Sequence, residues 1–281
     1  MKETLAFLAT PIAASTILAV MLGYFGTHIL ARRIIFIDIA VAQIAALGTM
    51  IGLLLGFAEE ALEVQFFSYL LTMLVIGGFA LLRQDKLPIP AEAVIGIIYC
   101  LGLALALLLA EYIPGGSNYI TKTITGNILW VTWGQVNNLA LLFAAIGVIH
   151  VLLRKSFHRL SCDRTRPGTG VLVHRRLLNL LFYITFGVVV VKAVLIGGVF
   201  LVFTLLIAPS TAAALFVESW KARLIWSCMI GVIGTIAGVI LSYSLNISNG
   251  PAIVCLLGLL AFVLAAVRLS RPLHHTNGEP C

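Results

Sequence analysis

A series of apolar runs, each long enough to cross a bilayer, is the feature that most constrains this fold. About nine segments of roughly 20 residues can be counted, which is the length that a membrane-spanning helix needs. Of the 281 residues, 61% are hydrophobic and only 10% are charged, which excludes a soluble globular domain. In lipid, backbone amides must be paired internally, so such runs fold as helices. The sequence predicts an all-α polytopic membrane protein of about eight or nine transmembrane helices, forming one domain over residues 1–281.

The run over residues 192–215 is broken by Gly197, Gly198 and Pro209. Helix breakers at membrane depth are tolerated where the chain lines a cavity or packs on other protein, and discontinuous helices are frequent in transport paths. Glycine and proline are also common in ordinary membrane helices, so this run alone does not distinguish a transport path from a kinked helix. The stretch 177–217 lies between two basic loops, and we expect it to hold two helices with a turn near the paired glycines.

The distribution of lysine and arginine predicts the orientation. All basic residues except Lys2, Lys122 and Lys192 can be placed on one side of the membrane, in short clusters between apolar runs. The positive-inside bias makes that side cytoplasmic, with the amino terminus outside and the polar tail 268–281 inside. The net charge of +7 therefore reflects membrane topology rather than nucleic-acid binding.

Two polar residues fall within the second apolar run. Asp38 lies just past Arg32 and Arg33, and charged groups within a bilayer are expensive and usually functional. Its position near the interface favours pairing with one of these arginines over a role in transport. Gln43 lies deeper, where an amide either bridges two helices or faces a polar path. The sequence does not distinguish these two interpretations.

The predicted outer face carries an acidic loop with Glu59, Glu60 and Glu63. A negative rim raises the local concentration of cations or attracts a basic partner surface. Solvated loop acids that serve no ligand are the simpler explanation, and we keep both. On the opposite face, the basic loop 154–176 can bind anionic lipid headgroups or present a short helix to a cytoplasmic partner.

Catalytic and metal-binding motifs are missing. The sequence has no phosphate-binding G-x-x-x-x-G-K-[ST] loop, no H-E-x-x-H and no G-x-S-x-G. The five cysteines are scattered and show neither zinc-ligand spacing nor a disulfide framework. His28 and His150 are each alone near a helix end, where hydrogen bonding is a commoner role than metal ligation. We therefore expect neither an enzyme nor a permanently bound cofactor.

Five segments of the chain resemble, in their order along the sequence, one protein family. This family is the membrane permease subunits of the bacterial zinc/manganese/iron ABC importers. The most specific of them is the run Val194–Ala213, which resembles the family's V-G-x-L-L-V-x-A-L-L-I-x-P-A-x-T-A. The resemblance covers nearly the whole chain. The other segments are Gly26–Gly48 with its Arg-Arg-Ile-Ile-Phe, Glu92–Gly96, Thr125–Thr132, and Leu241-Ser-Tyr followed by Asn249-Gly-Pro.

The resemblance implies a homodimer in the bacterial inner membrane, surrounded by lipid, with two cytoplasmic ATPases and an extracellular metal-binding protein. A divalent metal ion would be the transported substrate, and ATP would be hydrolysed by the partner. The loop 154–176 falls where the family has its coupling helix, and its candidate coupling residues are Leu160, Asp163, Gly168 and Gly170.

One departure from the family concerns the metal path. Where the family has aspartate and histidine in G-D-A-x-S-H, this chain has Ile39 and Gln43, and Asp38 takes the glycine position. Neutral amides are weak metal ligands. With the resemblance, the candidate path residues are Asp38, Gln43 and Pro209, and Asp38 is the candidate metal ligand. The alternatives are an ABC importer of a metal chelate or other small solute, and a secondary transporter that uses no ATP.

Overall fold

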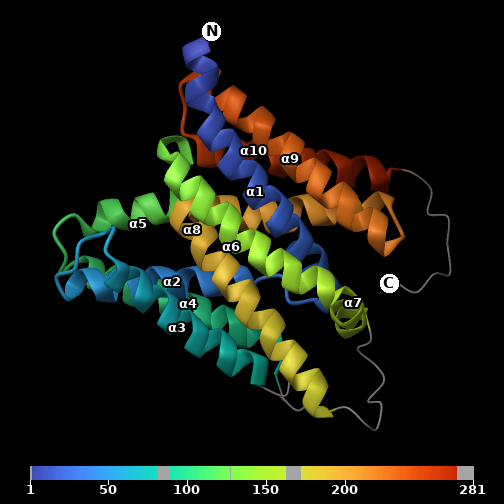
Figure 1. Cartoon of the computed structure of the whole chain (residues 1–281), viewed down its shortest axis with the longest axis horizontal. Coiled ribbons are helices and arrows are strands. Elements are labelled where there is room, and N and C mark those ends of the chain that lie inside the picture. Colours follow the sequence, from blue (N-terminus) through green and yellow to red (C-terminus); the bar gives the residue numbers. More distant parts are fainter. Residues whose placement is uncertain (1, 82–88, 127, 163–171, 271–281) are drawn as a thin grey trace.

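The computed structural model describes residues 2–81, 89–126, 128–162 and 172–270. This part of the chain folds into ten α-helices and one short 3-10 helix, η2 (Figure 1). Eight of the helices are long and apolar enough to cross a membrane, which confirms the all-α polytopic fold. The elements are α1 (Lys2–Arg32), α2 (Ile37–Leu54), α3 (Leu62–Leu81), α4 (Ala91–Ala110), α5 (Gly116–Thr125), η2 (Ile128–Trp130), α6 (Trp133–Leu152), α7 (Arg154–Cys162), α8 (Leu172–Phe216), α9 (Trp220–Leu245) and α10 (Asn249–Leu269).

The longest element, α8, is two helices joined at Gly198. This residue has φ 77° and ψ 164°, outside the helical region. The Phe182 ring lies 5.5 Å from that of Phe25, and the Ser210 hydroxyl is 3.4 Å from the Gly23 carbonyl oxygen, so both halves contact one part of α1. In a straight helix, residues 182 and 210 would be about 40 Å apart. The chain therefore turns back at Gly198 (Figure 1), and the predicted turn at the paired glycines is confirmed.

The basic clusters gather at one end of the bundle. Arg32, at the end of α1, donates a 3.0 Å hydrogen bond to Asn179 near the start of α8, and Asn179 donates to the Ala80 carbonyl at the end of α3. Arg268, at the end of α10, donates to the Leu215 carbonyl at the end of α8. Sequence-distant basic segments thus meet, as the charge pattern predicts.

The opposite end holds the acidic loop and the start of α1. The Phe7 ring lies 6.5 Å from the Tyr243 ring at the end of α9. Glu59, in the turn after α2, forms an ion pair with Lys122 of α5. The described basic clusters and the acidic loop therefore lie at opposite ends. Which end faces the cytoplasm remains an expectation from the charge pattern.

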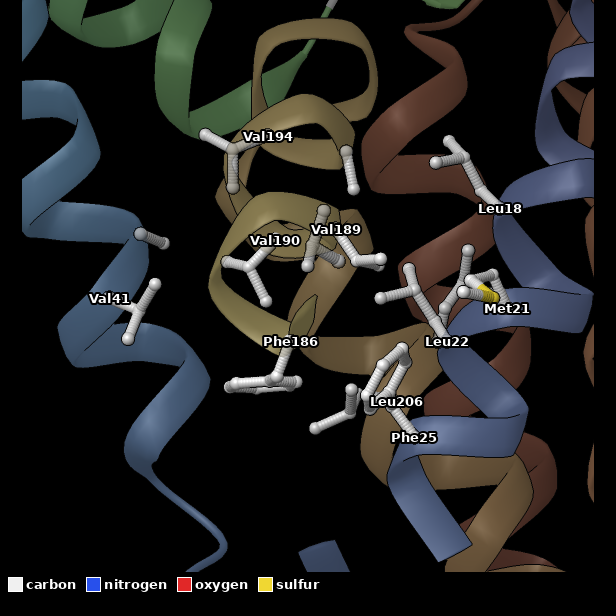
Figure 2. Close-up of a cluster of buried hydrophobic side chains, with 14 of the residues drawn as sticks. Leu18, Met21, Leu22, Phe25, Val41, Phe186, Val189, Val190, Val194 and Leu206 are labelled. Carbon is white, nitrogen blue, oxygen red and sulfur yellow. The ribbon is translucent and has the colours of Figure 1, made fainter. Parts of the chain in front are cut away.

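The apolar core surrounds the first half of α8. Figure 2 shows Phe186, Val190 and Val194 of α8 between Val41 of α2 on one side and the α1 side chains on the other. Phe186 and Val190 are completely buried. α8 therefore separates α1 from α2 and holds α2 in a fixed place within the bundle.

The beginnings of α7 and α6 each have a local cause. The basic loop 154–176 begins as the helix α7, because Phe157 is completely buried and holds this segment against the core. α6 begins at Trp133, because Thr132 and Gln135 form a capping box at its amino end. Asp163, Gly168, Gly170 and the tail after residue 270 lie outside the described residues.

Gly198→Ala tests the turn in α8. A β-carbon at residue 198 would lie 2.3 Å from the Gly126 nitrogen, and the positive φ strains any L-residue by about 1 kcal/mol or more. We expect a melting temperature several degrees lower, or loss of folded protein, measured by fluorescence-monitored unfolding in detergent. Gly258→Ala is the control, since nothing lies within 4 Å of its added carbon. Equal melting temperatures for both variants would contradict the tight junction.

Candidate functional site

α2 is the most enclosed membrane-length helix in the described part of the chain. Its span is 78% buried, compared with 28% for α3 and 22% for α4. Both polar residues that the sequence singles out on this helix are buried, since Asp38 is 1% exposed and Gln43 is 5% exposed. The centre of the bundle therefore contains a carboxyl group and an amide on a single helix.

Asp38 is not paired with an arginine, and the expectation of such a pair is wrong. Neither carboxylate oxygen of Asp38 has a hydrogen-bond partner within the described residues. Arg32 instead donates from Nε to the Ser161 hydroxyl at 3.2 Å and from Nη1 to Asn179 Oδ1 at 3.0 Å. Arg33 is exposed and occupies the left-handed backbone region, with φ 55°. The short connection between α1 and α2 thus separates the arginine pair from the carboxyl group.

Gln43 packs against α4. The backbone of Gly102 approaches it closely, since a β-carbon added at residue 102 would lie 3.4 Å from that of Gln43. The amide makes no hydrogen bond to any described residue, so the structure does not contain the helix-bridging bond that was one of its two readings. Gln43 therefore lies buried where α2 packs against α4.

The neighbouring face of α3 adds a second unpaired group beside the carboxyl group of Asp38. Ser68 donates to the Ala45 carbonyl of α2 at 2.9 Å, whereas the hydroxyl of Thr72, one turn further along α3, is buried and has no partner. Sequence reasoning missed Thr72. The available indication was its spacing of four residues from Ser68 in an otherwise apolar run.

The side-chain atoms in this region that could act as metal ligands are oxygen and nitrogen atoms of isolated side chains. Among the described residues there is no group of three or more His, Cys, Asp or Glu that could hold a metal ion. Asp38 is the one carboxyl group buried on α2.

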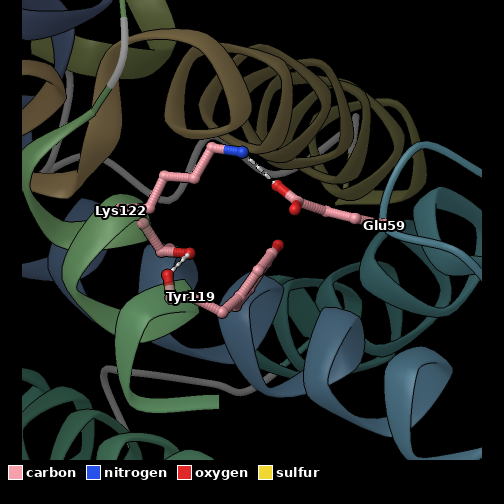
Figure 3. Close-up of polar contacts among 4 residues, drawn as sticks. Glu59, Tyr119 and Lys122 are labelled. Carbon is pink, nitrogen blue, oxygen red and sulfur yellow. Dashed lines mark hydrogen bonds and ion pairs between the residues drawn. The ribbon is translucent and has the colours of Figure 1, made fainter. Parts of the chain in front are cut away.

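The predicted outer acids are exposed, as both a rim and solvated loop acids would be. Glu59 pairs with Lys122 of α5, and both side chains are nearly half exposed (Figure 3). Glu60 and Glu63 are also exposed. Tyr119 of α5 lies beside the pair, and burial raises the pKa of its hydroxyl above the ordinary value. The ion pair links the α2–α3 turn to α5.

A second buried polar cluster lies at the basic end. His150 of α6 bonds to the Tyr24 hydroxyl at 3.0 Å and to the Thr185 hydroxyl at 2.9 Å. His28 of α1 bonds to the Ser161 hydroxyl at 2.8 Å. Both histidines are thus hydrogen-bonded, as their positions in the sequence led us to expect. Sequence reasoning did not single out Ser161, which contacts both His28 and Arg32.

The remaining candidates lie apart from α2. Pro209 is buried in the second half of α8 and packs beside Gly231 of α9, where a β-carbon would lie 3.6 Å from the proline ring. Leu160, on α7, is half-buried and packs against the core. The transport-path role of Pro209 and the coupling role of Leu160 stay predictions.

A family model described as the ABC 3 transport family matches residues 4–268. The chain belongs to this family. It is thus the membrane-spanning permease component of an ABC transport system, which works with partner ATPase and binding-protein subunits. The permease itself is not a catalytic subunit.

Several curated relatives are similar over most of their length. An uncharacterised membrane protein of Synechocystis sp. is 28% identical over 263 residues, which is 93% of this chain and 91% of that protein. The manganese transport system membrane protein MntC of Halalkalibacterium halodurans is 25% identical over 255 residues, covering 88% and 82% of the two chains. A probable metal transport system membrane protein of Chlamydia pneumoniae is 25% identical over 244 residues, covering 84% and 80%.

Solved structures share the fold. PsaBC from Streptococcus pneumoniae, in complex with Fab, superposes with a TM-score of 0.71 at 22% identity, covering 92% of this chain and 90% of that chain. An inward-facing conformation of a putative metal-chelate type ABC transporter gives a TM-score of 0.68 at 19% identity, covering 93% and 85%. The arrangement of the described helices is therefore the permease fold of this family.

The contrast between Asp38 and Arg32 predicts opposite effects on stability. Asp38→Asn removes a buried carboxyl group that has no partner, so we expect an unchanged or higher melting temperature. Arg32→Gln leaves the groups on Ser161 and Asn179 without their donor, at a cost of about 2 kcal/mol or more. Fluorescence-monitored unfolding of both purified variants measures this difference. If Asp38→Asn lowered the melting temperature as much as Arg32→Gln does, Asp38 would have a structural partner.

Proposed function

We propose that the chain is the permease subunit of an ATP-driven importer of divalent metal ions in the bacterial inner membrane. The observation that carries this proposal is the buried carboxyl group of Asp38, which lies on the most enclosed helix with both oxygens unpaired. A buried carboxylate is costly without a counter-charge, so the group is suited to meet a cation. The names of the manganese and other metal transport relatives support the same cargo class.

Transport proceeds by alternating access in this proposal. The metal ion is the substrate, and no resident cofactor takes part. The ion enters from the acidic rim of Glu59, Glu60 and Glu63 and passes the side chains of Asp38 and Gln43 along α2. The two halves of α8, with Gly198 and Pro209 as their breaks, change their tilt and open the path to each side in turn.

Zinc, manganese and iron are the candidate cargoes, and the donor atoms favour manganese among them. The side-chain oxygen atoms on α2 belong to Asp38, Gln43 and Thr49, and this helix carries no histidine or cysteine. Carboxylate, carbonyl and water oxygens suit manganese, whereas zinc prefers imidazole and thiolate. Because the donors are few, the ion keeps much of its water shell.

The partners follow from the two ends of the bundle. The ATPase meets the basic end through residues 154–176, whose first part is α7. The metal-binding protein docks on the acidic rim. Two copies of this single-domain chain form a homodimer, and lipid covers the exposed apolar helix faces.

Substituted cysteines test the proposed orientation. Glu63 and Lys155 are both exposed and lie at opposite ends of the described bundle. With the amino terminus outside, Glu63→Cys should react with a membrane-impermeant maleimide in intact cells, and Lys155→Cys only after permeabilisation. The wild-type chain gives the background from its own cysteines. The reverse labelling pattern would invert the topology.

Asp38→Asn tests the path. We expect metal uptake to fall at least tenfold, because one carboxyl-to-cation interaction of about 1.4 kcal/mol or more is lost, while the amount of folded protein stays constant. Cellular manganese, zinc and iron are measured by mass spectrometry in chelator-treated medium. Glu111→Gln is the matched control, since it removes an exposed acid that lies outside the proposed rim and path. Uptake by Asp38→Asn equal to wild type would remove Asp38 from the path.

A metal chelate is the second candidate cargo. The neutral Gln43 and Ile39 favour it, because few protein ligands are needed when a chelator keeps the ion. Uptake of a labelled chelate that free metal does not compete would support this alternative. A chain that co-purifies with no ATPase would instead point to a secondary transporter.

A further inference from the structure

We infer that Ser161 is the positioning residue that joins α7 to α1, so that the two helices move together during transport. The inference rests on the proposed function, in which the ATPase contacts residues 154–176. The inference adds to that function the route by which a displacement of α7 reaches the helices that carry the proposed metal path. Four sets of contacts support it.

α7 has one anchored face and one free face. Phe157 and Ser161 are one turn apart, so they share a face, and they are 0% and 4% exposed. The basic side chains of Arg154, Lys155 and Arg159 are exposed. The anchored face holds α7 to the membrane domain, and the basic face remains available to a partner surface that carries acidic residues.

The Ser161 hydroxyl bridges two residues of α1. Arg32 donates from Nε to the Ser161 oxygen at 3.2 Å, so the hydroxyl proton is free to be donated to His28 Nδ1 at 2.8 Å. All three side chains are at least nine-tenths buried. Buried hydrogen bonds do not exchange readily with water, so they transmit a displacement better than exposed contacts do.

The contacts continue from Arg32 into two other helices. Arg32 Nη1 donates to Asn179 of α8, and Asn179 donates to the Ala80 carbonyl of α3. Along the chain, Arg32 also ends α1 next to the bend at Arg33, after which α2 begins with Asp38 in its first turn. A displacement of Ser161 thus reaches the α1–α2 corner that carries the carboxyl group of the path.

Apolar contacts keep α7 in place when Ser161 is changed. The Phe157 ring stacks on the His150 ring at 4.4 Å, and Tyr24 and Thr185 hold His150 by hydrogen bonds. Trp220 of α9 adds contacts at the same end. We therefore expect the Ser161→Ala chain to fold and to bind its ATPase.

The experiment measures metal transported per ATP hydrolysed. The permease is reconstituted in proteoliposomes with the ATPase that co-purifies with it and with its binding protein, and manganese, zinc and iron(II) are offered in turn. For Ser161→Ala we expect ATP hydrolysis to persist while the metal-to-ATP ratio falls about fivefold or more, in the usual range of coupling between distant sites. Ser161→Thr keeps the hydroxyl and should retain a higher ratio than Ser161→Ala.

Ser156→Ala is the matched control on the same helix, because Ser156 is only half-buried and makes no side-chain hydrogen bond to the described residues. Its ratio should equal that of wild type. If Ser161→Ala does not assemble, Asn179→Ala interrupts the same route one bond further on, and its ratio should fall in the same way. A wild-type ratio in Ser161→Ala, or in Asn179→Ala where that variant replaces it, overturns the inference.

Failure of the inference and failure of the proposed function are distinguishable. If the wild-type complex transports none of the three metals, the proposed function fails. If wild type transports metal and the Ser161 and Asn179 variants keep its ratio, the cargo stands and only the route through Ser161 is wrong.

Discussion

The fold depends on how the break in α8 is enclosed. A helix in lipid must pair its backbone groups internally, and an interruption is stable only where other protein covers it. At Gly198 the ends of two other helices provide the cover. Gly126 at the end of α5 lies against the break, and Gly250 at the start of α10 lies against Thr125. A β-carbon added at Gly126 would clash with the carbonyl oxygen of Gly197, and one added at Gly250 would clash with that of Thr125. This junction lets α8 turn back within the bundle and pack one half between α1 and α2.

The two buried charged residues beside the α1–α2 connection differ in their partners. Arg32 is held by Ser161 and Asn179, and its guanidinium carbon lies 3.6 Å from the centre of the Phe182 ring. Asp38, a few residues later, has no partner among the described residues. The first arrangement fixes the position of several helices, because removing either partner leaves a buried group unpaired. The second leaves a buried carboxyl group without a hydrogen-bond partner among the described residues, and for this reason we propose it for the transport path.

The departure from the family pattern fits this arrangement. A neutral amide at Gln43 and an aliphatic side chain at Ile39 leave Asp38 as the one carboxyl group buried on α2. The membership of the chain in the ABC 3 transport family and the shared permease fold are therefore compatible with a path whose residues differ from the family's motif.

The sequence by itself determined the membrane architecture. Apolar runs of bilayer length leave helices as the only option, and the Lys and Arg clusters together with Gly197 and Gly198 place the turn within α8, because hydropathy, charge and glycine act locally. Only the tertiary structure decided which polar groups meet. The sequence favoured a pair between Asp38 and an arginine, and it did not single out Ser161, 129 residues away from its partner Arg32. Hydrogen bonds between helices depend on how the helices are rotated and crossed, and that is set by side-chain packing across the whole bundle rather than by any one segment.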